Sequence, residues 1–183
     1  MRLYRQTLED FSLYPGLELE DKELSQLRKA AGMMSAKMRA VRIVSASSVS
    51  KGDLQQRLIH KGETAADAAE AIRWMEELDL LDDRKTAQQV VQRCISKGYG
   101  IARAKQALYE KRIPKIYWDE VLEDYPEQID VVAEYVKSHL TNPKDPKQVR
   151  KITDALMRRG HSYRTVRQAL DLASVDEDFL EDF

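Results

Sequence analysis

The feature that most constrains this chain is an internal repeat with a period of about 50 residues. Three leucines mark it, because Leu108 lies 50 residues after Leu58 and Leu156 lies 48 residues after Leu108. Each of these repeat leucines is followed by a basic residue three positions later, and by apolar residues ten and fourteen positions later. The followers are Lys61, Lys111 and Arg159 at three, Ala68, Trp118 and Val166 at ten, and Ile72, Leu122 and Leu170 at fourteen. Such a period predicts tandem units, each too small to bury its apolar face alone.

Each repeat is predicted to contain three helices. Apolar residues recur at three- and four-residue spacing, between Ser, Thr, Gly and Pro residues that are typical of helix ends. The predicted helices are 35–45, 53–60 and 64–78, then 86–96, 102–111 and 115–123, and finally 127–140, 148–159 and 163–172. A serine within 47–50 is expected to cap helix 53–60, and Gly62 to end it. The fold class is therefore all-α, with three tandem three-helix repeats at residues 35–83, 84–124 and 125–183.

The two ends of the chain are less regular in sequence. Residues 1–34 are expected to form a separate N-terminal segment, in which Met1 to Leu19 are irregular or briefly extended and Asp21 caps a short helix that ends near Gly32. The acidic tail from Val175 to Phe183 is expected to fray, unless Phe179 or Phe183 pins it.

Charge alternates in phase with the repeat. Nine basic residues and one acid between Arg84 and Lys115 give that stretch a net charge of +8, within a chain whose formal net charge is -1. The preceding residues 63–83 hold eight acids and one base, and residues 119–134 hold acids only. Ion pairs between neighbouring helices would explain one such block. Basic stretches also lie at residues 28–61 and 144–167, and three basic blocks in phase with the repeat favour an extended surface for a charged partner.

Residues typical of catalysis or metal binding are not combined in this sequence. Its three histidines and Cys94 are far apart, and the Lys97-Gly98-Tyr99-Gly100 turn lacks the rest of a phosphate-binding loop. The single cysteine excludes an intrachain disulfide, and no apolar run reaches the length of a membrane span. We therefore expect a non-enzymatic, cytoplasmic binding protein without a metal or cofactor, and we expect Cys94 to be a buried apolar residue.

The candidate contact residues are basic side chains of the second and third repeats, together with one turn aromatic. They are Lys97, Tyr99, Arg103, Lys105, Lys111, Arg112, Arg158, Arg159, Arg164 and Arg167. Tyr99 could stack on a base or on a partner side chain. It could equally lie on its own helices, whereas Trp74 and Trp118 are expected to pack.

Two groups of motifs lie in the first half and the middle of the chain. They are Leu80-Leu81-Asp82-Asp83, then Ser96-Lys97-Gly98-Tyr99-Gly100, Arg103, Leu108, Lys111 and Ile113, and upstream Ser50-Lys51-Gly52-Asp53-Leu54-Gln55-Gln56-Arg57-Leu58 with Lys61-Gly62. In order and spacing these motifs resemble those of the RecX family, bacterial regulators of the RecA recombinase. The resemblance covers about residues 38–172. Thr86, Ile101 and Arg112 depart from the family pattern, since an aromatic residue, proline and glycine are usual there.

The resemblance implies an elongated, curved array of repeats that lies in the groove of the RecA–DNA filament. It also implies inhibition of ATP hydrolysis, strand exchange and coprotease activity by a protein without enzymatic activity of its own, and hence regulation of DNA repair, recombination and the SOS response. We expect the protein to be a monomer. Two alternatives stay open from the residues alone. The chain could bind DNA without RecA, or serve as a helical scaffold for another protein.

Overall fold

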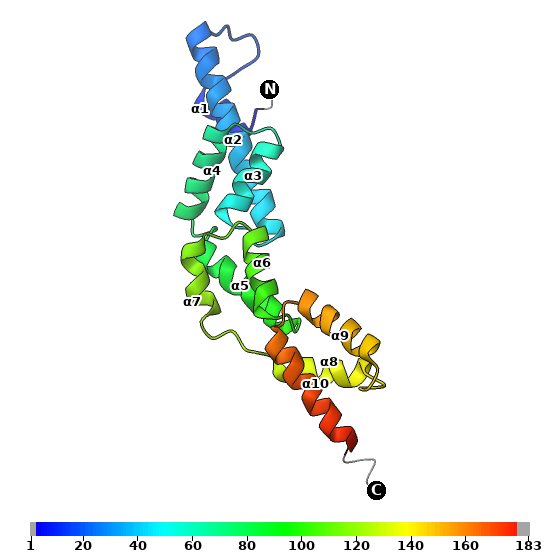
Figure 1. The fold of residues 1–183 in the computed structure, drawn as a ribbon. Helices are drawn as coiled ribbons and strands as arrows, with labels where there is room; N and C mark the ends of the chain where they lie inside the picture. Colours follow the sequence, from blue (N-terminus) through cyan, green and yellow to red (C-terminus); the bar gives the residue numbers. More distant parts are fainter. Residues whose placement is uncertain (1–2, 179–183) are drawn as a thin grey trace. The chain divides into compact units, whose positions relative to one another are not determined.

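Every regular element of this chain is a helix over residues 3–178, the range that the computed structural model describes (Figure 1). The predicted all-α fold class is thus confirmed. The chain forms two compact units, an N-terminal unit of residues 1–86 and 111–113 and a C-terminal unit of residues 87–110 and 114–183. The division into three repeats stays a prediction, because these units follow a different partition.

The N-terminal unit begins with a helix where the sequence indicated irregular or extended chain. Helix α1 spans Arg5–Asp10, and its Arg5 Nε lies 2.8 Å from Glu9 Oε1 one turn later. Thr7 is buried and α1 packs on α2. The expectation was wrong because contact with α2, which the local pattern does not reveal, supports a helix that is too short to be stable by itself.

Helix α2 is continuous from Asp21 to Ala46, although a stop was predicted near Gly32. It begins with a capping box in which Glu20 and Glu23 are the reciprocal partners, so Asp21 is the first helical residue and not the cap. A Cβ on Gly32 would lie 3.0 Å from Asp67 Oδ2 on α4. Gly32 therefore permits close helix packing and does not end the helix, and the predicted boundary at residue 34 falls inside α2.

Helices α3, Lys51–His60, and α4, Ala65–Glu77, pack beside α2 (Figure 1). Ser50 caps α3 by accepting the Asp53 amide, which confirms the predicted serine cap. The buried core comprises Ala36, Ala40, Val49, Leu54, Leu58, Ala68, Ala71, Ile72, Met75 and Leu81. Trp74 packs against this core, as expected, with the Lys37 ammonium 5.2 Å from its ring centroid.

The middle of the chain contains α5, Asp83–Ser96, and α6, Ile101–Glu110, followed by the short 3₁₀ helix η1, Lys115–Tyr117, and α7, Trp118–Leu122. Tyr117 donates its amide to the Pro114 carbonyl, and this three-residue bond explains why the helix predicted at 115–123 opens as 3₁₀. Cys94 is buried as predicted, and burial raises the pKa of its thiol.

The last three helices form their own core in the C-terminal unit. They are α8, Ile129–His139, α9, Pro146–Arg158, and α10, Tyr163–Asp178. Their buried side chains are Val132, Val136, Ile152, Leu156, Val166 and Ala169. Helix α9 starts two residues early because Pro146 follows the Asp145 cap. Helix α10 continues past Val175, where fraying was expected, to Asp178, and Phe179 and Phe183 lie outside the described residues.

Candidate functional site

Two turns of the C-terminal unit, at residues 98–100 and 159–161, meet backbone to backbone. The Gly100 amide donates to the Arg159 carbonyl at 2.9 Å, and His161 Nε2 lies 3.0 Å from the Gly98 carbonyl oxygen. Glycine is required on both sides. A Cβ on Gly160 would lie 2.6 Å from Arg103 Cβ, and one on Gly100 would overlap the Gly160 carbonyl group. The Gly98-Tyr99-Gly100 motif is therefore explained by close packing.

Tyr99 is half-buried at this contact of two turns. Its carbonyl accepts the Tyr125 hydroxyl at 2.6 Å, and burial raises the pKa of Tyr125 to about 12. The Arg159 guanidinium carbon lies 5.8 Å from the Tyr99 ring centroid and 5.3 Å from that of Tyr135. Cation–π contacts thus hold Arg159 between two aromatic residues. This arrangement favours the second alternative for Tyr99, a ring that lies on its own helices.

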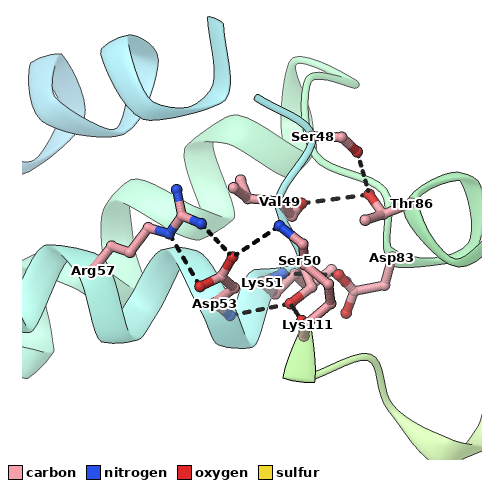
Figure 2. A network of polar contacts seen from close by, with 9 residues as sticks. All are labelled: Ser48, Val49, Ser50, Lys51, Asp53, Arg57, Asp83, Thr86 and Lys111. Atoms are coloured by element: carbon pink, nitrogen blue, oxygen red, sulfur yellow. Dashed lines mark hydrogen bonds and ion pairs between the residues drawn. The ribbon is translucent and has the colours of Figure 1, made fainter. Parts of the chain in front are cut away.

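The N-terminal unit contains a related turn contact, shown in Figure 2. Ser50 Oγ accepts the Asp53 amide and donates to the Lys111 carbonyl at 2.5 Å. Ser50 and Lys111 precede Gly100 and Arg159 by 50 and 48 residues, so the same two repeat positions are joined in both places. Asp53 forms two hydrogen bonds with Arg57 and lies 4.0 Å from Lys111 Nζ.

The fourth residue after each repeat leucine adopts the left-handed backbone conformation. Gly62, Arg112 and Gly160 have φ angles of 91°, 53° and 87°. Arg112, a departure from the family pattern, therefore keeps the turn geometry while it carries a Cβ into the left-handed region.

The Leu80-Leu81-Asp82-Asp83 motif supports the start of α5. Leu81 enters the core, while Asp82 accepts the Lys85 amide at 3.0 Å, and this hydrogen bond lowers the pKa of Asp82. Asp83 is buried and accepts the Lys51 amide at 2.8 Å (Figure 2). Burial raises the pKa of Asp83 despite that bond. These contacts explain the motif by its structural role at the start of α5.

The predicted basic residues divide into engaged and available groups. Arg103 lies 3.2 Å from Glu110, and Arg167 lies 4.0 Å from Asp171. Lys111 faces Asp53, and Arg159 faces the two tyrosines. Five of the predicted basic residues are exposed and have no ion pair to any residue that the structure describes; they are Lys97, Lys105, Arg112, Arg158 and Arg164.

The turns bring together only part of the predicted set. Lys97 and Arg103 both lie near Cys94, where their charges favour the thiolate, and Arg103 adjoins the Gly160 turn that also places Arg159. Lys111 and Arg112 belong instead to the N-terminal unit. Arg164 and Arg167 lie about one turn apart on α10.

A pocket of about 230 Å³ beside the two turns was not predicted from the sequence. Gly98, Tyr135, Ser138, Arg159 and His161 contribute to its wall. Burial lowers the pKa of His161, whose Nδ1 has no hydrogen-bond partner among the described residues. The nearest signal in the sequence is Gly160, which occupies the repeat position of Gly62 and so marks the turn before His161.

The described part of the chain offers little for other chemistries. It contains no group of three His, Cys, Asp or Glu residues arranged to hold a metal ion. Among the same residues, no helix combines the length and apolar character needed to cross a membrane.

Comparison with known proteins finds relatives along most of the chain. It is 29% identical over 154 residues to regulatory protein RecX of Vibrio parahaemolyticus, covering 82% of this chain and 98% of the relative. It is also 29% identical over 152 residues to regulatory protein RecX of Chlorobaculum tepidum, covering 81% and 94%. No protein-family model matches the chain.

Solved structures with the same fold have lower sequence identity. A crystal structure of regulatory protein RecX superposes with a TM-score of 0.72 at 19% identity, covering 91% of this chain and 85% of that one. RecX from Lactobacillus salivarius gives a TM-score of 0.66 at 16% identity, covering 80% and 99%. The resemblance predicted from the motifs is confirmed: this chain is similar to proteins named regulatory protein RecX along most of its length, and it shares their fold.

Proposed function

We propose that this protein is a non-enzymatic modulator of RecA that binds the RecA–DNA filament. Binding suppresses ATP hydrolysis, strand exchange and coprotease activity, and so regulates DNA repair and recombination in the cytoplasm. The observation that carries the proposal is the similarity to proteins named regulatory protein RecX, which extends over 82% of this chain and 98% of the first relative.

The charge distribution supports a filament as the partner. Lys97 and Lys105 are exposed near the turn contact, and Arg158 and Arg164 are exposed on the last two helices. Exposed cations that are not neutralised by a neighbouring carboxylate raise the local potential and steer an anionic partner. A protein filament on DNA presents such a partner. The engaged residues Arg103, Lys111 and Arg159 contribute chiefly by fixing the turns.

The test is the rate of ATP hydrolysis by preformed RecA filaments on single-stranded DNA, titrated with this protein at two salt concentrations. The proposal predicts dose-dependent inhibition that saturates. Inhibition well below one molecule per RecA protomer favours end-capping or cooperative binding in the groove. Unchanged hydrolysis at saturating, folded protein contradicts the proposal.

Measurements at the same two salt concentrations distinguish direct binding to DNA from binding to the RecA filament. A protein that acts through phosphate contacts alone binds single-stranded DNA without RecA, and its affinity falls steeply as salt rises. Inhibition that persists when binding to free DNA has been abolished by salt supports RecA as the partner.

A further inference from the structure

The residue directly after each repeat leucine is a large apolar side chain exposed to solvent. These residues are Ile59 on α3, Tyr109 on α6 and Met157 on α9, with exposed fractions of 41%, 72% and 44%. Single exposed apolar residues are common and need no explanation. Here an exposed apolar residue recurs at the same repeat position three times, with the spacings of 50 and 48 residues that separate the repeat leucines. This recurrence indicates that the three residues have a common function.

Packing within the helices does not account for these three residues. The side chains three and four positions earlier, which share their helix face, are polar in every case. They are Gln55 and Gln56 on α3, Lys105 and Gln106 on α6, and Thr153 and Asp154 on α9. The Tyr109 hydroxyl makes no hydrogen bond to any residue that the structure describes. Each apolar side chain therefore stands alone within a polar face.

Basic residues lie next to each of the three. Two positions further along stand Lys61, Lys111 and Arg159, and additional cations at 112 and 158 flank the second and third. In protein interfaces, an apolar anchor residue is typically surrounded by a rim of polar or charged residues, and each of the three side chains has such surroundings. Within four positions of each anchor the basic residues outnumber the acids, which are Glu63, Glu110 and Asp154 respectively. The net charge is therefore positive in all three places, and the complementary surface is acidic.

We propose that Ile59, Tyr109 and Met157 are three equivalent anchors that dock onto an acidic surface of successive identical protein subunits. The inference rests on the proposed function, under which those subunits are RecA protomers of the filament. Equivalent anchors in tandem repeats match a partner whose own sites recur. Protein is favoured over nucleic acid because Ile59 and Met157 have no aromatic face on which a base could stack.

The experiment measures the affinity of an N-terminally labelled protein for preformed RecA filaments on single-stranded DNA by fluorescence anisotropy. One variant carries Ile59→Gln, Tyr109→Gln and Met157→Gln. The matched control carries Leu78→Gln, Ile116→Gln and Leu172→Gln, whose side chains are 47%, 79% and 54% exposed but do not recur at equivalent positions. Far-UV circular dichroism verifies that both variants keep the helical content of the wild type.

The inference predicts that the anchor variant binds the filament about tenfold more weakly or worse, while the control stays within about twofold of the wild type. Unchanged affinity of the anchor variant, or an equal loss in both variants, overturns it. An equal loss on RecA-free DNA assigns the anchors to nucleic acid and overturns docking on protein. If the wild type itself does not bind filaments, the proposed function fails, and the inference fails with it.

Discussion

Alanine at Gly160 tests the close contact of the two turns in the C-terminal unit. Gly160 has a φ of 87°, and a Cβ there would lie 2.6 Å from the Cβ and 3.0 Å from the Cα of Arg103. Gly62 is a matched control, because it has a φ of 91° but no atom within 4 Å of an added Cβ. Alanine at either position introduces the same left-handed backbone strain, but only alanine at Gly160 also collides with Arg103.

The expected costs follow from these geometries. A Cβ in the left-handed region costs about 1–2 kcal/mol, and the reduced freedom of the unfolded chain returns about 0.4–1 kcal/mol, so Gly62→Ala should cost about 1 kcal/mol. Overlap with a backbone that cannot retreat adds about 1–3 kcal/mol, so Gly160→Ala should cost about 2–4 kcal/mol. Gly100→Ala has the overlap without a positive φ, and it should cost about 1–3 kcal/mol.

Urea unfolding followed by far-UV circular dichroism measures these differences. Each variant is compared with wild type by the midpoint and slope of its unfolding transition under identical conditions. Equal losses for Gly160→Ala and Gly62→Ala would refute the close turn contact. An unchanged free energy of unfolding for Gly100→Ala would also refute it, because Gly100 is the glycine that the other turn contributes to the contact.

Four further changes test the turns and the basic surface. Arg112→Gly should raise the free energy of unfolding by about 0.5 kcal/mol, since a left-handed residue no longer carries a Cβ; urea unfolding checks this. Ser50→Ala should lower it by about 1–2 kcal/mol in the same assay, because a helix cap and a turn bond are lost together. Burial lowers the pKa of His161, so its contribution to stability is complete above the ordinary value of 6.5 and is lost as the pH falls below it. Wild type should thus lose more stability than His161→Gln between about pH 7 and about pH 5, and equal losses would exclude this role. Alanine at both Lys97 and Lys105 should weaken filament binding about threefold or more and reduce its salt dependence without changing the urea midpoint, whereas unchanged affinity would remove them from the interface.

The repeat made most helices predictable, because it gave three independent views of one pattern. The serine cap and the apolar spacing around the repeat leucines predicted the bounds of α3 and α4 to within two residues, although Thr64 caps α4 and does not begin it. Predictions of helix ends from local sequence were wrong where packing against another helix determines the structure. Gly32 has the sequence character of a helix end, yet it sits inside α2 because α4 approaches there.

The basic residues were predictable as a set but not in their individual roles. Sequence spacing does not reveal that Arg159 lies against Tyr99 and Tyr135, or that Lys111 faces Asp53, since these contacts join residues from 24 to 60 positions apart. The structure therefore divides residues of equal charge into those that hold the turns and those that remain exposed. The exposed ones, such as Lys97, are the stronger candidates for direct partner contact.

Sedimentation with RecA filaments tests the central claim most directly. The protein is mixed at near-physiological salt either with preformed RecA filaments on long single-stranded DNA or with the same DNA alone, and the pellet is assayed. We predict that it sediments with the filaments and stays in the supernatant with DNA alone. Equal sedimentation with both would contradict filament recognition in favour of DNA binding, and absence from both pellets would contradict binding to either.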